Sequence, residues 1–408
     1  MFTDGINKAI PFLLLPILTK YLSPSEFGLA SNYLILVNIL IIFIGINIDG
    51  AISANYFRLS KPQLSLYISN AITVLVSSFL LVFILVYTFH AQIFNYTKIP
   101  RHYQIITVFL AFFQMITSIN MVLWRLEEKP LKFGIYQILQ TVLNLGLSLY
   151  FIIYLSRGWK GRAEGFFLSS IVFGIMSLYI LWKRGYIKFN LNIKYIKDAV
   201  FFGLPLVPHS LSIWIRTGID KILITKYLGV AANGIYSTGF QFGVLLTFLM
   251  AAFNNAFVPF LFKKLSDKDD LRLQKTKKKL VKMSYVLMLI IFILTLLLTL
   301  ISYVLINNFL PEDYKKASIF VFWALLAQAF QGMYLLVGNY IFYIKKTKKF
   351  AMITLSCSIL QVVLSYTLIQ KIGLMGAAYS TVIVSLLNFL VVWYYSAKVY
   401  PMPWFKKN

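Results

Sequence analysis

One apolar stretch of this sequence carries an unusual density of ionisable side chains. Between Phe201 and Gly229 lie His209, Arg216, Asp220 and Lys221. A guanidinium binds a phosphate through two parallel hydrogen bonds, and an ammonium binds it as a point charge. The two cations therefore predict a site for an anion, and the carboxylate is a candidate for a coupling cation.

Alternative interpretations of these four residues stay open. Arg216 and Asp220 are four residues apart and share a helix face, so a local ion pair is equally consistent with their spacing. Lys221 lies about 100° round the helix from Asp220, where it can extend to the membrane interface or point into a cavity. His209 is favoured as a hydrogen-bonded structural residue over a proton relay.

Other charges lie near the ends of apolar stretches. Lys8, Arg58 and Arg125 are further candidates for a cationic cavity, although interfacial anchoring explains them equally well. Asp49 and Asp220 are interpreted as the carboxylates in or beside the spans that could bind a coupling cation, with an ion pair as the alternative. Neither residue identifies the coupling ion.

Composition indicates which elements must position these residues. The chain has 408 residues, 59% of them hydrophobic and only 13% charged, which excludes a soluble globular enzyme. Runs long enough to cross a bilayer recur from end to end, so we expect an all-α polytopic membrane protein with about twelve spans. The expected spans are Phe2–Thr19, Phe27–Ile46, Leu64–Phe89, Tyr103–Trp124, Phe133–Leu155, Ala163–Trp182, Ala199–Thr225, Gly234–Phe262, Met283–Ile306, Ser318–Ile344, Phe350–Gln370 and Leu374–Ala397.

The net charge of +26 is explained by topology. Most Lys and Arg residues lie in the even-to-odd connections and at the ends of the chain, which predicts that both termini are cytoplasmic and makes nucleic acid an unnecessary partner. The densest cluster, Lys263–Lys279, is interpreted as a cytoplasmic loop rather than a site for acidic lipid. Short connections leave no room for a catalytic domain, so we expect neither enzymatic activity nor a cofactor. Cys357 is the single cysteine and can form neither an intramolecular disulfide nor a thiolate metal cluster.

An internal repeat predicts two similar halves. A shift of 206 residues aligns Thr19–Ser31 with Thr225–Ser237, and ILQTVL from Ile138 resembles ILQVVL from Ile359. The predicted domains are an N-lobe of residues 1–182, a cytoplasmic linker of residues 183–198 and a C-lobe of residues 199–408. Because each half has an even number of spans, six, the two lobes have the same orientation in the membrane. We expect a cavity between them near the midplane, an architecture typical of transporters.

Several segments together resemble a known family. NKAIPFLLLPILTKYLSPSEFG, GINIDGAISANYFR, the region from Phe202 to Ser237 and GLMGAAYSTV are similar to the polysaccharide (O-antigen type) flippases of the multidrug/oligosaccharidyl-lipid/polysaccharide exporter superfamily. One departure is that the first half lacks a counterpart of Asp198–Leu206, since the shift places Met1 opposite Val207. Members of the family usually carry extra residues there, so we expect either further residues upstream or a shortened first helix.

The resemblance implies a fold and a function. It implies two six-helix lobes and alternating access. It also implies transport of an undecaprenyl-diphosphate-linked oligosaccharide, such as an O-antigen, capsule or exopolysaccharide repeat unit, from the cytoplasmic to the outer leaflet of the bacterial cytoplasmic membrane. The implied partners are this lipid-linked oligosaccharide, membrane lipids, and a glycan polymerase with its chain-length machinery.

Two other functions are weighed against this one. A drug exporter of the same superfamily needs carboxylates in its cavity to bind organic cations, and few occur here. A membrane glycan polymerase needs catalytic acid or base residues, usually on a large outer loop, and the outer connections are short.

Overall fold

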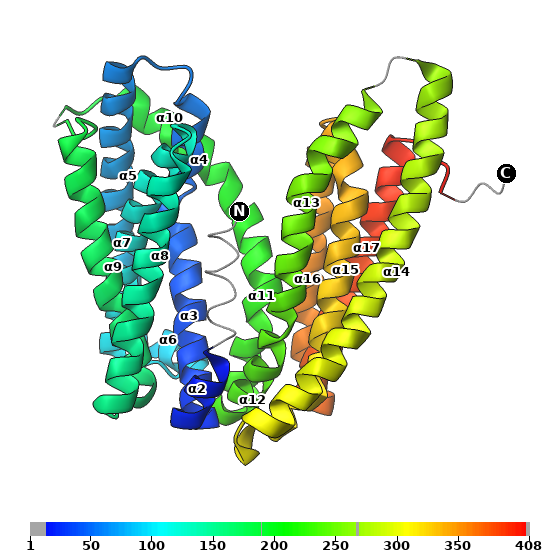
Figure 1. The fold of residues 1–408 in the computed structure, drawn as a ribbon. Coiled ribbons are helices and arrows are strands. Elements are labelled where there is room, and N and C mark those ends of the chain that lie inside the picture. Colours follow the sequence, from blue (N-terminus) through cyan, green and yellow to red (C-terminus); the bar gives the residue numbers. More distant parts are fainter. Residues whose placement is uncertain (1–13, 189, 267–268, 405–408) are drawn as a thin grey trace. The chain divides into compact units, whose positions relative to one another are not determined.

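The computed structural model describes residues 14–188, 190–266 and 269–404, and every element in those ranges is helical (Figure 1). Packing divides the chain into two compact units, Tyr21–Gly234 and Ile235–Asn408. The short helix α2 (Leu15–Tyr21) precedes the first unit in the chain, but its residues up to Lys20 are grouped with the second unit. Its helices are α3 (Pro24–Gly45), α4 (Ile48–Asn55), α5 (Lys61–Thr88), α6 (His90–Thr97), α7 (Arg101–Leu126), α8 (Pro130–Leu149), a π-helical turn (Tyr150–Tyr154), α9 (Gly158–Lys183), α10 (Ile193–Gly203), a 3-10 turn (Leu204–Leu206), α11 (Val207–Leu228) and the start of α12 (Val230–Gln241).

The second unit is a bundle of long helices. Its elements are α13 (Gly243–Leu265), α14 (Asp270–Phe309), a 3-10 turn (Glu312–Ala317), α15 (Ser318–Tyr343), α16 (Thr347–Ile372) and α17 (Leu374–Val399). The segment after α17 folds back so that the Trp404 ring lies 5.9 Å from that of Tyr285, 6.0 Å from that of Tyr340 and 5.5 Å from that of Trp393. The Tyr285 hydroxyl donates to the Trp404 carbonyl at 2.5 Å. Trp404 is therefore buried among helices α14, α15 and α17.

The predicted fold class is confirmed. Within the described ranges, 11 helices are long and apolar enough to cross a membrane, and the chain is a multi-pass membrane protein. The expected count of twelve is not confirmed, because most of the first predicted span, Phe2–Thr19, lies outside the described residues. The lobe boundaries predicted at residues 182 and 199 follow the repeat rather than the packing and stay a prediction.

The dense cationic segment is not a loop over most of its length. Helix α13 continues to Leu265, and α14 begins at Asp270 and runs for 40 residues. Asp269 caps α14, its carboxylate accepting from the backbone N–H groups of Leu271 and Arg272. The connection predicted at Lys263–Lys279 is therefore largely helical rather than an irregular loop, while its cytoplasmic location stays a prediction. Lys, Arg, Gln and Leu are good helix formers, so the charges end the apolar run without ending the helix.

The internal repeat has a structural counterpart in the first unit. Gly28 of α3 and Gly234 of α12, which the shift of 206 aligns, lie against each other where their helices cross. A Cβ added to either glycine would lie 3.1 Å from the backbone nitrogen of the other. The Gly28 position also faces the Val230 carbonyl, and the Gly234 position faces the Pro24 carbonyl. The shift of 206 aligns Pro24 with Val230, so these two contacts are equivalent in the repeat. The crossing is therefore reciprocal, and small residues allow the two backbones to approach.

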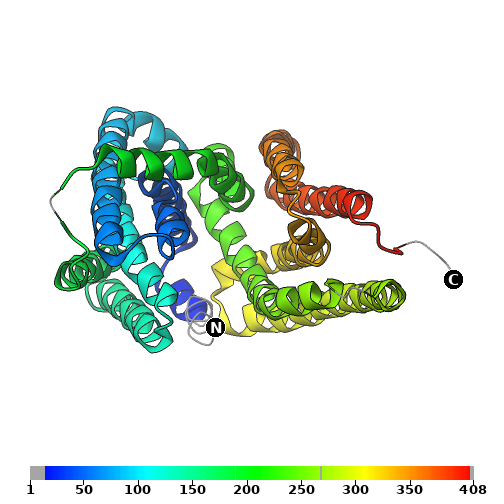
Figure 2. The same ribbon diagram turned by 90° about the horizontal axis from the view of Figure 1, so that it is seen from above.

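The linker that precedes α11 is hydrogen-bonded to α5. Ser69 Oγ accepts from the Lys188 backbone N–H at 2.7 Å and donates to the Tyr186 carbonyl at 3.0 Å. Asn70 accepts from the Asn192 N–H at 2.8 Å. Helix α10 then runs across the bundle rather than along it (Figures 1 and 2). The chain consequently enters α11 from a fixed position.

Candidate functional site

A bend in the chain leads into the charged helix α11. Gly203 ends α10 against the Ile46 carbonyl, where a side chain has no room. Pro205 lies in the 3-10 turn and Pro208 in the first turn of α11, where a missing N–H costs no helical hydrogen bond. The sequence thus fixes the direction in which α11 crosses the first unit.

Helix α11 is held against α3 by polar contacts along its length. The Trp214 indole N–H donates to the Ile35 carbonyl at 3.1 Å. Nearer the other end, the Asn32 amide donates to the Thr225 hydroxyl at 2.9 Å and to the Thr97 carbonyl at 2.8 Å, and accepts from Asn233 at 2.9 Å. These contacts fix the rotation of α11 and hence the directions of its charged side chains.

The three central charges occupy different environments on α11. Asp220 is 3% exposed, and its carboxylate accepts from the backbone N–H of Lys221 at 2.9 Å. Arg216 and Lys221 are half-buried. Two cations at this depth of a membrane span are costly and call for a functional or structural reason. The predicted ion pair between Arg216 and Asp220 and the predicted anion site both stay predictions.

A polar cavity of about 310 Å³ lies within the first unit, beside the start of α11. Its polar walls come from four elements: the α3–α4 junction, α4, α7 and α11. Its lining residues are Ile41, Ile42, Gly45, Asn47, Asp49, Gln114, Met115, Ser118 and Ser210. A carboxylate, two amides and two hydroxyls suit either sugar hydroxyl groups or a small cation.

The geometry of the α3–α4 junction creates this cavity. Ile46 and Asn47 adopt the left-handed conformation, with φ of 42° and 49°, so the chain turns sharply between the two helices. Asp49 follows in the first turn of α4, and its carboxylate accepts from the Gly50 N–H at 3.0 Å. The Ser210 hydroxyl lies 3.5 Å from the Asn47 carbonyl oxygen Oδ1. The structure thus brings predicted candidate Asp49 to the first turns of α11.

The remaining candidates do not line this cavity. Arg58 is exposed after α4, and Arg125 is exposed at the end of α7 with its guanidinium 5.3 Å from the ring centroid of Phe133. His209 is exposed in the first turn of α11. Lys8 lies outside the described residues. No group of three or more His, Cys, Asp or Glu side chains that could hold a metal ion occurs in the described ranges.

Sequence reasoning missed a charged cluster at the start of α9. Arg162 donates from one nitrogen to Asn144 Oδ1 and to Ser148 Oγ of α8, both at 2.9 Å. Glu164 pairs with Arg157 at 3.0 Å and accepts from the Tyr103 hydroxyl at 2.8 Å. The restriction of membrane carboxylates to Asp49 and Asp220 was therefore wrong, since Glu164 lies inside the predicted sixth span. The position of Glu164 inside an apolar run was the sequence signal that could have identified this cluster.

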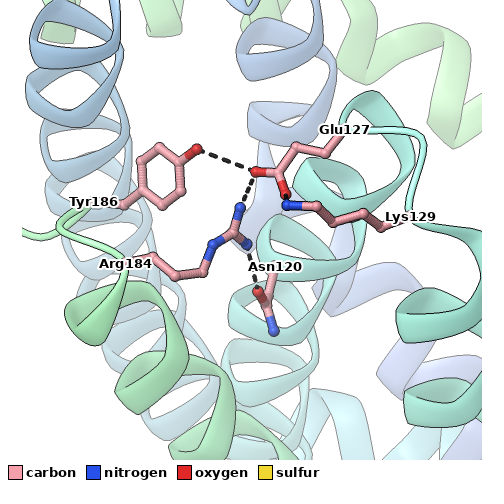
Figure 3. Close-up of polar contacts among 5 residues, drawn as sticks. All are labelled: Asn120, Glu127, Lys129, Arg184 and Tyr186. Atoms are coloured by element: carbon pink, nitrogen blue, oxygen red, sulfur yellow. Dashed lines mark hydrogen bonds and ion pairs between the residues drawn. The ribbon is translucent and has the colours of Figure 1, made fainter.

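A second missed cluster ties together the ends of α7 and α9. Figure 3 shows the Arg184 guanidinium between the Glu127 carboxylate and the Asn120 amide, with Tyr186 and Lys129 directed at the same carboxylate. The Glu127 side chain is 10% exposed and that of Arg184 is 22% exposed. The Tyr186 hydroxyl donates to Glu127 at 3.2 Å, and burial raises the pKa of this phenol above its ordinary value. This cluster holds two connections of the first unit together.

Comparisons with known proteins agree with the fold. Residues 1–265 match the family model "Polysaccharide biosynthesis protein", and residues 205–367 match the model "MatE". An uncharacterized membrane protein of Haemophilus influenzae is 27% identical over 86% of this chain and 83% of its own length. The capsular polysaccharide biosynthesis protein CapF of Staphylococcus aureus is 25% identical over 98% of each chain.

Solved transporter structures share the architecture. An inward-facing multidrug resistance MATE family transporter of the MOP superfamily superposes with a TM-score of 0.75, at 15% identity over 96% of this chain and 94% of that one. The lipid II flippase MurJ in an inward closed conformation superposes with a TM-score of 0.67, at 18% identity over 96% of this chain and 87% of that one. With the family model covering more than half of the sequence, the chain belongs to the polysaccharide biosynthesis protein family.

Proposed function

We propose that this protein moves a polyprenyl-diphosphate-linked oligosaccharide from the cytoplasmic to the outer leaflet of a bacterial cytoplasmic membrane. The observation that carries the proposal is the pair of half-buried cations, Arg216 and Lys221, on a membrane-spanning helix of a polysaccharide biosynthesis protein. A diphosphate is the anionic part of such a substrate, and Arg and Lys are the side chains that bind it. The relationship to CapF and the fold shared with the lipid II flippase support the same substrate class.

The proposed mechanism is alternating access without covalent chemistry. The diphosphate binds near Arg216 and Lys221, the sugars occupy the polar cavity at the start of α11, and the lipid tail stays in apolar surroundings. Rearrangement of the two lobes then opens the site to the outside. An inside-negative potential favours outward movement of the anion by about 2.3 kcal/mol per charge per 100 mV. The potential alone therefore supplies a direction for the cycle.

The proposed orientation places both termini in the cytoplasm. The concentration of Lys and Arg in the even-to-odd connections supports this assignment. In this orientation the Glu127–Arg184 cluster and α10 lie at the cytoplasmic ends of the spans. A glycan polymerase and its chain-length machinery are the proposed functional partners, because a translocated repeat unit must be consumed on the outer side.

A second candidate function, export of an organic cation, rests on a separate observation. Asp49 places a carboxylate in the polar cavity, and residues 205–367 match the MatE model. Uptake of an organic cation by inverted vesicles measures this activity directly. If Asp49→Asn abolishes uptake and Arg216→Gln does not, the cation function is the correct one.

The first proposal is tested by translocation in proteoliposomes. Purified protein is reconstituted with fluorescent undecaprenyl-diphosphate oligosaccharide, and the fraction of glycan exposed in each leaflet is followed by enzymatic cleavage from outside. The test variant is Arg216→Gln combined with Lys221→Gln. The matched control is Lys183→Gln combined with Lys188→Gln, which removes the same charge from exposed positions.

Translocation that persists in the control and is lost in the test variant supports a flippase with a cationic site. Equal rates in the two variants would remove Arg216 and Lys221 from the substrate site. Asp220 is tested in the same assay, because a double Arg216→Gln, Asp220→Asn variant that recovers translocation lost in Arg216→Gln alone identifies a structural ion pair.

A further inference from the structure

A second cavity of the first unit differs in character from the polar one. It has a volume of about 430 Å³ and lies between α3, α5, α6 and the bend before α11. The twelve residues that line it are Leu40, Phe43, Ile46, Ser78, Leu81, Val82, Leu85, Val86, Phe89, Ile93, Leu204 and Val207. We refer to this cavity as the apolar groove.

The apolar groove offers no polar partner to a ligand. Ser78 is its single polar side chain, and that hydroxyl donates to the Ile44 carbonyl at 2.5 Å and lies 3.0 Å from the Leu75 carbonyl. Leu81, Leu85 and Phe89 are partly exposed along one side, so a chain can enter from the surrounding lipid. The ligand that fits this surface is a hydrocarbon chain.

The size of the groove limits how much hydrocarbon it takes. A water molecule occupies about 30 Å³, and a methylene group is of similar size, so roughly fourteen such groups fill the groove. This amount corresponds to part of one chain rather than to a whole lipid. The groove therefore holds one segment of a long tail while the rest remains in the bilayer.

The groove and the polar cavity share two structural elements. At the α3–α4 corner, Phe43 and Ile46 line the groove, while Gly45 and Asn47 line the polar cavity. At the start of α11, Val207 lines the groove and Ser210 lines the polar cavity. The apolar and polar cavities thus adjoin one corner of the same compact unit.

The proposed anion site is also close to the groove along the chain. Arg216 follows Val207 on α11, and nine residues of helix span roughly 13 Å. A lipid whose tail lies in the groove therefore has its head group within reach of the polar cavity and of the helix that carries Arg216. An amphiphile with a single long tail, a charged diphosphate and hydroxylated sugars offers a group to each of these surfaces.

We infer that the apolar groove binds the polyprenyl tail of the lipid-linked substrate. This inference rests on the proposed function for the identity of the head group, but the groove itself is tested without any sugar. Hydrocarbon in a bilayer gains nothing from the hydrophobic effect when it enters an apolar protein surface, so the groove acts through packing. It selects a tail by shape and positions the attached head group.

Photo-crosslinking tests tail binding directly. A benzophenone amino acid is placed at Leu85, which lines the groove, or at Leu80, a residue of the same helix outside it, with 45% and 52% exposure respectively. The probe is radiolabelled undecaprenyl phosphate in phosphatidylglycerol vesicles. Labelling at Leu85 that exceeds labelling at Leu80 and is competed by unlabelled undecaprenyl phosphate supports the inference. Equal labelling at the two positions, or equal competition by added phosphatidylglycerol, overturns it.

A groove-filling variant tests the consequence for transport. Leu85→Trp should slow translocation of the long-tailed substrate by roughly fivefold, as expected for the loss of about ten methylene contacts, while Leu80→Trp leaves it unchanged. A substrate analogue with a one-isoprene tail has only five carbons to place in the groove and should be less sensitive to Leu85→Trp. Monodisperse elution in detergent verifies that each variant is folded. If Leu85→Trp does not elute as a monodisperse species, Leu81→Phe is used as the groove-filling variant instead.

The tail site and the proposed function are contradicted by different outcomes. Specific labelling at Leu85 without any glycan translocation by wild-type protein would leave the tail site standing and remove the proposed function. Translocation that is equally fast in Leu85→Trp and wild type, together with labelling that does not favour Leu85, would leave the function standing and remove the tail site.

Discussion

Replacing Gly234 by alanine should force apart two helices of the first unit. A Cβ at this position would lie 2.7 Å from the carbonyl carbon of Pro24 and closer to its oxygen. The obstacle is backbone, which cannot rotate away as a side chain can, so α3 and α12 must separate. Overpacking of this kind costs about 1–3 kcal/mol. For a unit of this size, a loss of about 2 kcal/mol lowers the unfolding temperature by roughly 4–8 °C.

Because the contact between Gly28 and Gly234 is reciprocal, substituting both glycines gives a sharper test than substituting one. Gly28→Ala should be destabilising for the same reason, because its Cβ would lie 2.9 Å from Val230 Cγ1 and 3.1 Å from the Gly234 nitrogen. Once one alanine has separated the helices, the second meets less resistance. The cost of the double variant should therefore fall clearly below the sum of the two single costs.

Thermal unfolding in detergent, followed by intrinsic fluorescence, measures all three variants. Gly146→Ala is the matched control, because a Cβ there meets no atom within 4 Å and alanine is the better helix former by about 0.5–1 kcal/mol. It should unfold at the same temperature as wild type or slightly higher. If Gly234→Ala unfolds at the temperature of Gly146→Ala, the close backbone contact does not exist as described. The same conclusion follows if the cost of the double variant equals the sum of the costs of Gly28→Ala and Gly234→Ala.

Three further changes test other parts of the structure. Trp404→Ala should cost about 3 kcal/mol, because Trp404 is 4% exposed, whereas Tyr394→Ala, at a 72% exposed position, should be nearly neutral in the same unfolding measurement. Glu127→Gln and Arg184→Met should show a coupling energy of about 1–3 kcal/mol in a double-mutant cycle, and additive effects would contradict the ion pair. Ser69→Ala should expose the linker after α9 to limited proteolysis, since it leaves two backbone partners unsatisfied at about 1–3 kcal/mol, and an unchanged cleavage rate would contradict that role.

The spans were predictable because hydrocarbon imposes a simple rule on the chain. Apolar runs such as Phe350–Gln370 and Leu374–Ala397 correspond within a few residues to α16 and α17. The rule fails where a helix leaves the membrane, because hydropathy reports the solvent and not the backbone. Helix α14 shows this failure, since it begins with charged turns and continues into the apolar run without a break.

The candidate site was predictable only in its local part. A charge inside an apolar run is visible from the sequence, and this signal identified Arg216, Asp220 and Lys221. The polar cavity depends instead on the meeting of Asn47, Gln114 and other residues from helices far apart in the chain. No spacing rule connects such positions. Gly45 and Asn47 mark a turn between the two helices, but a local turn signal does not say which distant residues it brings together.

The structure places every proposed binding element in one compact unit. The apolar groove, the polar cavity and the cations of α11 all belong to residues 21–234, and the hydrogen bonds from Ser69 and Asn70 hold the entry to α11 in the same unit. A site within one rigid unit keeps its affinity for a ligand when that unit moves as a whole. In the proposed cycle, rearrangement of the protein therefore changes which leaflet the site faces, while the contacts that recognise tail, diphosphate and sugar stay the same. This division allows one set of contacts to load the substrate on one side of the membrane and to carry it to the other.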